Sequence, residues 1–172
     1  MIANAMSNTA STAPIHLIAA LIVKNEAAKL EACLQSIAGW VDEIVIVDSG
    51  SSDATLEIAQ KYGAKVYSHT DWQGFGMQRQ RAQYHVQGAW VMWLDADERV
   101  TPELKQSLQA ALNQYRAQQN VIFEFHRYSR GFGKFIRHCG WYPDRVLRVY
   151  RQDYTGYNNA LVHESVVKPQ DA

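Results

Sequence analysis

The sequence is poor in cysteine, with only Cys33 and Cys139 among 172 residues. Two cysteines are too few for a disulfide framework, and the pattern suits a reducing cytoplasm. Cys33 shares a helical stripe with Leu30, Leu34 and Ile37, so we expect it to be a small buried hydrophobic residue. Stability then has to come from an apolar core, which a chain of this length can form.

Net charge and long apolar segments are also lacking. Seventeen basic and seventeen acidic residues cancel, which leaves no overall field to favour nucleic acid or an anionic membrane. No apolar run approaches the ~20 residues that span a bilayer. Residues 1–14 are small and polar, with neither a basic start nor a long apolar stretch, and they predict a disordered leader rather than a signal peptide. We expect residues 15–172 to form one domain.

The apolar pattern switches repeatedly between the periods of strands and helices. Strands are predicted at residues 16–23, 43–47, 65–68, 89–94 and 121–126. Helices are predicted at residues 27–37, 53–62, 77–87 and 102–116. Asp53 is the expected N-cap of the second helix, and Thr101, followed by Pro102, that of the fourth. This order predicts an α/β fold with a mostly parallel sheet and right-handed crossovers.

The chain changes character from Tyr128 onward, where glycines interrupt an aromatic and basic stretch. Short β-like pieces are predicted at 146–150 and 161–162, and we expect this part to be a site-forming appendage on the sheet. Between Arg127 and Arg151 seven Lys or Arg residues face a single acid, Asp144. This basic strip could meet phosphates or anionic lipid head groups, or it could simply be a solvated surface.

The most informative motif is Asp95-Ala96-Asp97, which follows the apolar run at 89–94. Open α/β sheets bind ligands at the carboxyl ends of their strands. Two carboxylates there suit Mg²⁺ or Mn²⁺ carrying a phosphate, because such ions keep few protein ligands and take the rest from substrate and water. Alternatively, Asp97 could only cap the turn into the following helix.

Other polar groups are expected at the same edge of the sheet. Lys24-Asn25-Glu26 follows the first strand, and Asp48 ends the second before a Gly/Ser turn that reaches Asp53. An acid in the position of Asp48 can accept from a base N–H or a ribose hydroxyl. A Gly-Phe-Gly turn at 74–76 precedes a helix with Arg79 and Arg81, cations that suit a diphosphate, but it is a poor match to a dinucleotide fingerprint.

Three motifs of this chain together resemble family 2 glycosyltransferases with the GT-A fold. They are Leu21-Ile-Val-Lys-Asn-Glu26, Glu43-Ile-Val-Ile-Val-Asp48-Ser-Gly-Ser-Ser-Asp53-Ala-Thr and Trp93-Leu-Asp95-Ala-Asp97-Glu. A narrower likeness is to the glucosyltransferases that act on heptose in the inner core of bacterial lipopolysaccharide. It rests on Asp71-Trp-Gln-Gly-Phe-Gly76, Gln78-Arg79, Gly140-Trp-Tyr-Pro-Asp144-Arg-Val-Leu-Arg148 and Val162-His-Glu164. The resemblance covers roughly residues 15–167 and implies C-terminal helices that this chain lacks, so we expect a shortened C-terminus.

The resemblance implies a role for particular residues on the donor side of the site. Asp48 would contact the uracil or ribose of a UDP-sugar, and Asn25 and Glu26 would line the same nucleotide site. Arg79 would lie near the diphosphate. Asp95 would bind the ribose or the metal.

The remaining roles concern the metal and the acceptor. Asp97 would be the main metal ligand, and His163 a later ligand of the metal or the diphosphate. The general base toward the acceptor hydroxyl would be Asp144 or Glu164, with Asp144 slightly favoured. The divalent metal would be Mg²⁺ or Mn²⁺.

The implied reaction is an inverting transfer of a hexose, expected to be glucose, from a UDP-sugar to a lipopolysaccharide core or related glycan acceptor. It would proceed by metal-assisted single displacement at the cytoplasmic face of the inner membrane, where the acceptor is lipid-linked and the protein makes peripheral contact. Two alternatives stay open: a nucleotide-sugar or glycan-binding module without turnover, and a sugar-phosphate nucleotidyltransferase.

Overall fold

The structure is a computed structural model that describes residues 14–88, 90–128, 130–131, 134–135 and 144–171. Its elements, in chain order, are β1 (Leu17–Val23), α1 (Ala27–Ile37), β2 (Glu43–Asp48), α2 (Thr55–Lys61), β3 (Lys65–Ser68), α3 (Phe75–Tyr84), β4 (Trp90–Trp93), α4 (Pro102–Gln114), β5 (Ile122–Arg127), β6 (Arg130–Gly131), β7 (Lys134–Phe135) and β8 (Asp144–Arg151). Residues 1–13 of the expected leader lie outside this description.

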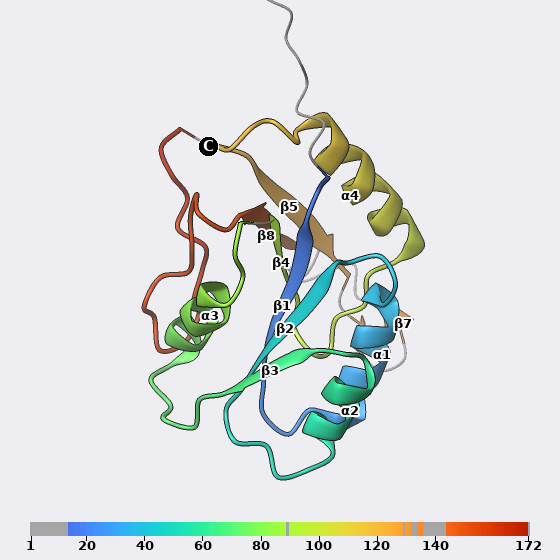
Figure 1. The fold of residues 1–172 in the computed structure, drawn as a ribbon, viewed down its shortest axis with the longest axis vertical. Helices are drawn as coiled ribbons and strands as arrows, with labels where there is room; N and C mark the ends of the chain where they lie inside the picture. The colour runs from blue at the N-terminus through green and yellow to red at the C-terminus, as the bar shows by residue number, and fades with distance from the viewer. Residues whose placement is uncertain (1–13, 89, 129, 132–133, 136–143, 172) are drawn as a thin grey trace, which may run out of the picture.

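A six-stranded sheet with the order β3-β2-β1-β4-β8-β5 forms the centre of the molecule (Figure 1). β3, β2, β1 and β4 pair in parallel. The apolar runs of β1, β2 and β4 are almost wholly buried, as expected for parallel strands covered on both faces. β8 runs antiparallel to both of its neighbours, β4 and β5. The expected α/β fold with a mostly parallel sheet is therefore confirmed.

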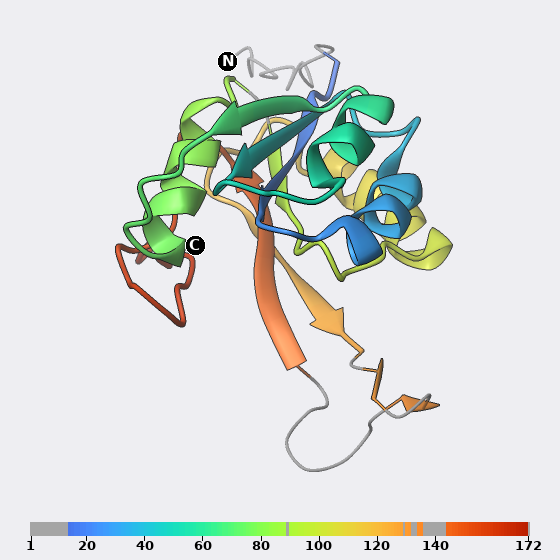
Figure 2. The same cartoon turned by 90° about the horizontal axis from the view of Figure 1, so that it is seen from below.

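Helices cover the two faces of the sheet unequally. α1, α2 and α4 lie on one face, and α3 lies on the other beside the C-terminal segment (Figures 1 and 2). Alternate residues of β1 serve the two cores: Leu21 packs with Leu34 on the α1 side, whereas Ala20 packs with Ala82 on the α3 side. Cys33 is fully buried in the α1-side core, as expected.

The C-terminal part differs from the sequence prediction in two respects. The expected β-like piece at 146–150 is a full strand, β8, that enters the sheet between β4 and β5. The C-terminal end of β5 and the N-terminal end of β8, which pair with each other, project from the body of the molecule (Figure 2). The prediction of a β-like piece at 161–162 is wrong, because residues 161–163 form a bend. The only β-bridge described in this segment joins Tyr157 to Val166.

The predicted helix starts are partly confirmed. The Thr101 side chain accepts from the Leu104 N–H at 3.2 Å, with Pro102 in the first turn of α4. α2 begins one residue later than a helix capped by Asp53 would, after Ala54, and the Asp53 carboxylate accepts from the Thr55 N–H (3.0 Å) within that turn. The helix expected at 77–87 is α3, which starts and ends earlier.

Candidate functional site

The carboxyl ends of β1, β2 and β4 bring the predicted motifs to one edge of the sheet. Val23 pairs in register with Asp48, so the loops after β1 and β2 start side by side. Leu94, directly after β4, donates its N–H to the carbonyl of Ala20 at 3.2 Å. The motifs that begin at Lys24, Asp48 and Asp95 therefore meet as the parallel sheet predicts.

Asp48 holds the loop that follows it. Its carboxylate is only 2% exposed and accepts from the backbone N–H groups of Gly50 (2.9 Å) and Ser51 (3.1 Å), and from the Ser51 hydroxyl. Gly50 adopts φ of +90°, which other residues rarely tolerate and which closes this turn. The carboxylate at the end of an apolar strand thus has a local structural explanation, and its contact with a nucleoside stays a prediction.

The loop after β1 is bonded to the loop after β2. The Asn25 side-chain oxygen accepts from the Ser52 N–H at 2.8 Å, and the Glu26 N–H donates to the Thr55 hydroxyl at 2.8 Å. Asn25 has φ of +55°, which Asn tolerates better than most residues. The Glu26 carboxylate faces Lys29 at 3.9 Å. Asn25 and Glu26 lie at the expected nucleotide edge, and their contact with a donor stays a prediction.

The turn between β4 and α4 leaves one carboxylate exposed. The Asp95 N–H donates to Glu98 Oε2 at 2.9 Å, and the Glu98 N–H donates back to the Asp95 carbonyl at 2.9 Å. Because Thr101 caps α4, the side chain of Asp97 is not used as a cap. Asp97 is exposed, and within the described residues its carboxylate has no hydrogen bond or ion pair. A free carboxylate therefore stands where the sequence predicts a metal ligand.

Asp95 differs from Asp97 because both of its oxygens are ion-paired. Oδ1 accepts from Arg79 Nη2 at 2.7 Å, and Oδ2 accepts from Arg148 Nη2 at 2.8 Å. Burial by itself would raise the pKa of Asp95, but Arg148 and Arg79 together hold it well below its ordinary value. Asp95 is therefore an anion held between two guanidinium groups.

Arg79 links a residue of the predicted donor side of the site to one of the two candidate bases of the acceptor side. Its Nε donates to Glu164 Oε1 at 2.7 Å while its Nη2 holds Asp95, so one guanidinium joins a carboxylate from the middle of the sequence to one near its C-terminal end. The guanidinium carbon lies 4.8 Å from the ring centre of Tyr157 and 5.5 Å from that of Trp93. Arg79 Nη1 is buried without a hydrogen-bond partner among the described atoms. The contact of Arg79 with a diphosphate stays a prediction.

Asp144 belongs to the same charged network through a second arginine. Arg127 Nε and Nη2 both donate to Asp144 Oδ2, at 2.9 and 2.7 Å. Arg127 Nη1 also approaches Glu98 Oε1 at 3.4 Å. Both candidate bases, Asp144 and Glu164, are thus brought near the Asp95 turn, each through one arginine.

The carboxylates and His163 do not form a preassembled metal centre. Within the described ranges there is no group of three or more His, Cys, Asp or Glu side chains that could hold a metal ion. His163 is exposed, with φ of +57°. A Mg²⁺ or Mn²⁺ ion with one or two carboxylate ligands and substrate phosphates needs no larger protein cluster, so the exposed oxygens of Asp97 fit such an ion. The assignments of Asp97, Asp95 and His163 to the metal stay predictions.

Three charged residues of the network were not identified from the sequence as site residues: Arg127, Arg148 and Glu98. The signal was present, because the basic strip contains both arginines, but the strip also fitted a solvated surface. Among its members with described side chains, Arg127 and Arg148 hold site carboxylates and Arg145 faces Glu124 at 3.5 Å. The guanidinium carbon of the fourth, Arg151, lies 5.6 Å from the centre of the Trp90 ring. Arg137 lies outside the described residues, and the side chains of Arg130 and Lys134 do too.

Gln78 is a further residue that the sequence did not single out as part of the site. It lies on α3, fully buried, and its amide donates to the Ser49 hydroxyl at 2.7 Å and to the His69 carbonyl at 2.8 Å. Ser49 directly follows Asp48. Gln78 therefore fixes the loop after β2 against α3, the helix that carries Arg79.

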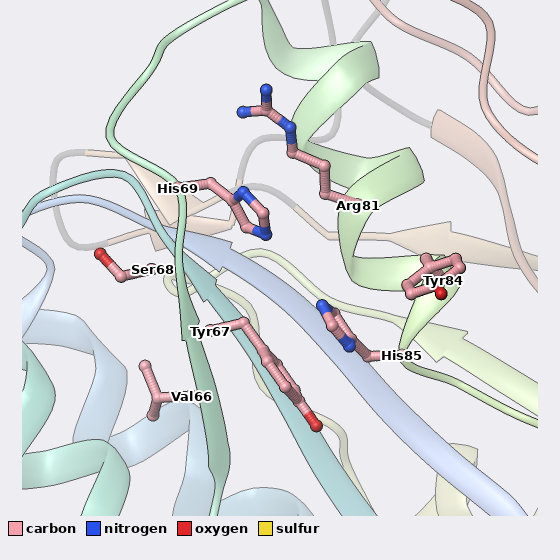
Figure 3. Close-up of a pocket in the computed structure, with 7 residues that line it drawn as sticks. All are labelled: Val66, Tyr67, Ser68, His69, Arg81, Tyr84 and His85. Atoms are coloured by element: carbon pink, nitrogen blue, oxygen red, sulfur yellow. The ribbon is translucent and has the colours of Figure 1, made fainter.

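A separate open pocket of about 420 Å³ lies between β3 and α3 (Figure 3). Its lining residues are Val66, Tyr67, Ser68, His69, Arg81, Tyr84 and His85. The Tyr67 and His85 rings stack within it, with centres 3.4 Å apart. None of the carboxylates or arginines of the charged network lines this pocket, so it is distinct from the site at the carboxyl edge.

The arrangement of a parallel sheet with these motifs at its carboxyl edge agrees with comparison to known proteins. Residues 19–165 match the sequence family described as Glycosyl transferase family 2. The chain belongs to this family. Membership confirms the resemblance drawn from the three motifs, and it disfavours the alternative of a sugar-phosphate nucleotidyltransferase.

Curated relatives of this family 2 chain include bacterial glycosyltransferases. Lipopolysaccharide core biosynthesis glycosyltransferase LpsC of Rhizobium meliloti is 37% identical over 161 residues, which cover 88% of this chain and 57% of LpsC. An uncharacterized glycosyltransferase of Rickettsia bellii is 32% identical over 159 residues, covering 88% of this chain and 52% of the relative. The chain therefore spans about half the length of the curated relatives it matches.

Solved structures show the same fold. S. aureus TarS (residues 1–349) superposes with a TM-score of 0.63 over 91% of this family 2 chain and 52% of that one, at 18% identity. The Pyrobaculum calidifontis mannosyltransferase PcManGT, solved with GDP-Man and Mn²⁺, gives a TM-score of 0.53 over 63% of this chain and 34% of that chain, at 22% identity. At these identities the comparison supports the GT-A fold alone. No helix in the described part of the chain is long and apolar enough to cross a membrane.

Proposed function

We propose that this chain binds a UDP-sugar and transfers its hexose, expected to be glucose, to a lipopolysaccharide core or related glycan acceptor. The observation that carries the proposal is the pair Asp95 and Asp97 at the carboxyl end of β4, beside the loops after β1 and β2. Family 2 membership, LpsC among the relatives and a TarS structure in complex with UDP-GlcNAc support this choice of reaction and donor.

The donor side needs a cation, and the chain offers suitable groups. Asp97, with Asp95 and His163 as further candidates, would hold a Mg²⁺ or Mn²⁺ ion. When bound, such an ion offsets the negative charge that develops on a UDP leaving group. Arg79 would have to turn its guanidinium to meet the diphosphate, because its Nη1, which has no hydrogen-bond partner among the described atoms, is buried.

The acceptor side needs a base, and two carboxylates compete for that role. Asp144 and Glu164 both reach the network around Asp95, and one of them would take the proton from the attacking hydroxyl. A single base is enough for a single displacement with inversion. Asp144 is the more accessible of the two, with 34% of its side chain exposed against 12% for Glu164, which favours Asp144.

Calorimetric titration of UDP-glucose tests the donor assignment directly. We expect binding in the presence of Mn²⁺, loss of that binding with EDTA, and a reduction of at least about tenfold in affinity for Asp97→Asn. Asp153→Asn is the matched control, since Asp153 is also exposed but lies away from the predicted motifs. If the folded wild-type chain binds no UDP-sugar, the donor assignment is wrong. Metal-dependent binding without transfer to any core acceptor would instead support a binding module.

A lipid-linked acceptor at the inner membrane would require contact with a bilayer. Because Arg127, Arg145 and Arg148 of the basic strip are already paired with acids of the protein, an apolar surface is better suited to that contact than the strip. Trp72, Phe75 and Leu161 are exposed and adjacent: the two rings meet edge to face at 4.8 Å, and the Phe75 N–H donates to the Leu161 carbonyl at 3.1 Å. Sedimentation with phosphatidylcholine vesicles should weaken for Trp72→Ser combined with Leu161→Ser. Equal binding by that variant and the wild type would contradict this contact.

A further inference from the structure

Strand β8 contains an irregularity at Arg148. In the ladder between β5 and β8, Phe123 pairs with Val149, and the next residue, Glu124, pairs with Leu147. Arg148 therefore has no partner across this ladder, which is the arrangement of a β-bulge. A bulge inserts one residue and changes the direction of side chains, and bulges are common next to ligand sites.

Core membership supports the presence of an extra residue at this position. Val146 packs into the core on the α1 side, and Leu147 packs into the core on the α3 side. Strict alternation would place residue 149 on the α3 side, but Val149 lies in the α1-side core. The alternation thus shifts by one residue at Arg148, which is itself buried, with only 5% of its side chain exposed.

The bulged arginine closes a ring of hydrogen bonds around the Asp95 turn. Arg148 Nη2 donates to Asp95 Oδ2 at 2.8 Å and to Glu98 Oε1 at 2.6 Å. The other oxygen of Glu98 accepts the Asp95 N–H at 2.9 Å. The backbone between these two acids therefore has a fixed shape, and Asp97 projects from it into solvent.

We propose that Arg148 is a positioning residue that, together with Glu98, holds the Asp95–Glu98 turn so that Asp97 is preset to bind the cation that carries the diphosphate of the donor. This inference rests on the proposed function. Arg148 acts through Asp95 and Glu98, and it need not touch the donor. A strand from the C-terminal part of the chain thereby shapes the donor motif, which belongs to the N-terminal part.

The test compares Arg148→Lys with Arg145→Lys. Lysine keeps the charge but cannot reach two carboxylates with the planar geometry of a guanidinium. Arg145 is the matched control on the same strand: it is exposed and, among the described residues, its ion pair is with Glu124. Glu98→Gln is a second variant that breaks the same ring from the other side, and it keeps the test valid if Arg148→Lys does not fold. The readouts are Mn²⁺-dependent UDP affinity and hydrogen exchange at the amides of Asp95 and Glu98.

We expect Arg148→Lys and Glu98→Gln each to weaken Mn²⁺-dependent UDP binding by about tenfold or more, and Arg145→Lys to leave it unchanged. The double variant Arg148→Lys with Glu98→Gln should lose less binding free energy for UDP than the two single variants added together, because both substitutions break the same ring of hydrogen bonds. The Asp95 and Glu98 amides should exchange faster in both single variants. Folded variants with wild-type affinity and wild-type exchange would overturn the inference.

Failure of the proposed function gives a different result. A folded wild-type chain that binds no UDP with Mn²⁺ removes the donor site, and with it the proposed role of Arg148. A wild-type chain that binds UDP normally, alongside an Arg148→Lys variant that binds equally well, removes only the inference.

Discussion

Arg127 on β5 and Asp144 at the start of β8 form a two-nitrogen ion pair, in which Nε and Nη2 donate to one carboxylate oxygen at 2.9 and 2.7 Å. The pair joins the outer ends of the two antiparallel strands and leaves the second oxygen of Asp144 without a described partner. A base that accepts a proton from a sugar hydroxyl needs such a free oxygen in a fixed orientation. The pair therefore bears directly on which acid serves as the base.

The first prediction separates the two candidate bases. Asp144→Asn should lower kcat by at least about 100-fold and leave UDP-sugar affinity unchanged, because the amide cannot take up the proton. Glu164→Gln should have a smaller effect on kcat and should also weaken donor binding, since Glu164 orients Arg79. Steady-state kinetics and calorimetry measure the two effects. The reverse ranking of the kcat values would make Glu164 the base.

The second prediction concerns the stability of the fold at acidic pH. The folded-state pKa of Asp95 is lowered, so the unfolded chain takes up a proton at about pH 4 while the folded chain resists protonation. The stabilisation from ionised Asp95 is therefore complete above about pH 4 and is lost as the pH falls through the folded-state pKa.

Thermal unfolding of the wild type and Asp95→Asn between pH 7 and pH 2 measures this contribution. The variant should be less stable at pH 7, and the difference in Tm should shrink below about pH 4. A difference that stays constant over the whole range would show that ionisation of Asp95 does not stabilise the fold.

The third prediction concerns the reactivity of Cys33. Burial raises the pKa of its thiol to about 12, although the nearby Arg99 acts in the opposite direction. In a Cys139→Ser background we expect no reaction with a disulfide reagent at pH 8, since the thiolate is scarcely populated and the sulfur is buried. The same protein in urea should react rapidly. Rapid labelling of the folded chain would show that the α1-side core opens.

The fourth prediction concerns the close approach of α3 to the C-terminal segment. A Cβ on Gly76 would clash with the carbonyl oxygen of Asn158. This oxygen belongs to the backbone, so it cannot move aside as the end of a flexible side chain could. Gly76→Ala should therefore lower the free energy of unfolding by about 3 kcal/mol and disturb the segment that carries Glu164.

Gly88→Ala is the control for this substitution. Nothing lies within 4 Å of its added Cβ, but its φ of +63° is unfavourable, so the expected cost is only about 1 kcal/mol. Urea unfolding measures both values. An equal cost for the two substitutions would show that the contact between Gly76 and Asn158 is not tight.

Much of the fold and half of the site could be predicted from local sequence patterns. Continuous apolar runs identified β1, β2 and β4, and the acids and polar turns after these runs marked the edge of the sheet at which Asp48 and Asp95 both lie. Such predictions succeed because a strand end is a local property, and parallel strands bring their carboxyl ends together. The expected piece at 161–162 failed because two apolar residues do not distinguish a strand from an exposed bend.

The pairing of charges could not be predicted in this way. Arg148 and Asp95 are 53 residues apart, and Arg79 and Glu164 are 85 apart. The contact between Arg148 and Asp95 depends on β8 inserting between β4 and β5 and on a bulge at one position in that strand. The contact between Arg79 and Glu164 depends on the C-terminal segment bonding to the start of α3. The sequence pattern predicts which face of a sheet a side chain points to only while side chains alternate strictly along the strand. A single inserted residue reverses this assignment, and the local sequence does not reveal where the insertion lies.

The sequence alone thus determined the four parallel strands of the sheet, their buried core and the acids at the carboxyl edge, because these follow from apolar periodicity and from the residues at strand ends. The tertiary structure alone decided which of those acids are held by arginines and which is left exposed. Asp95 is bound between Arg79 and Arg148, whereas Asp97, two residues away, is open to solvent. That difference is set by the distances between groups on separate elements, α3, β8 and the turn after β4, which no local stretch of sequence contains.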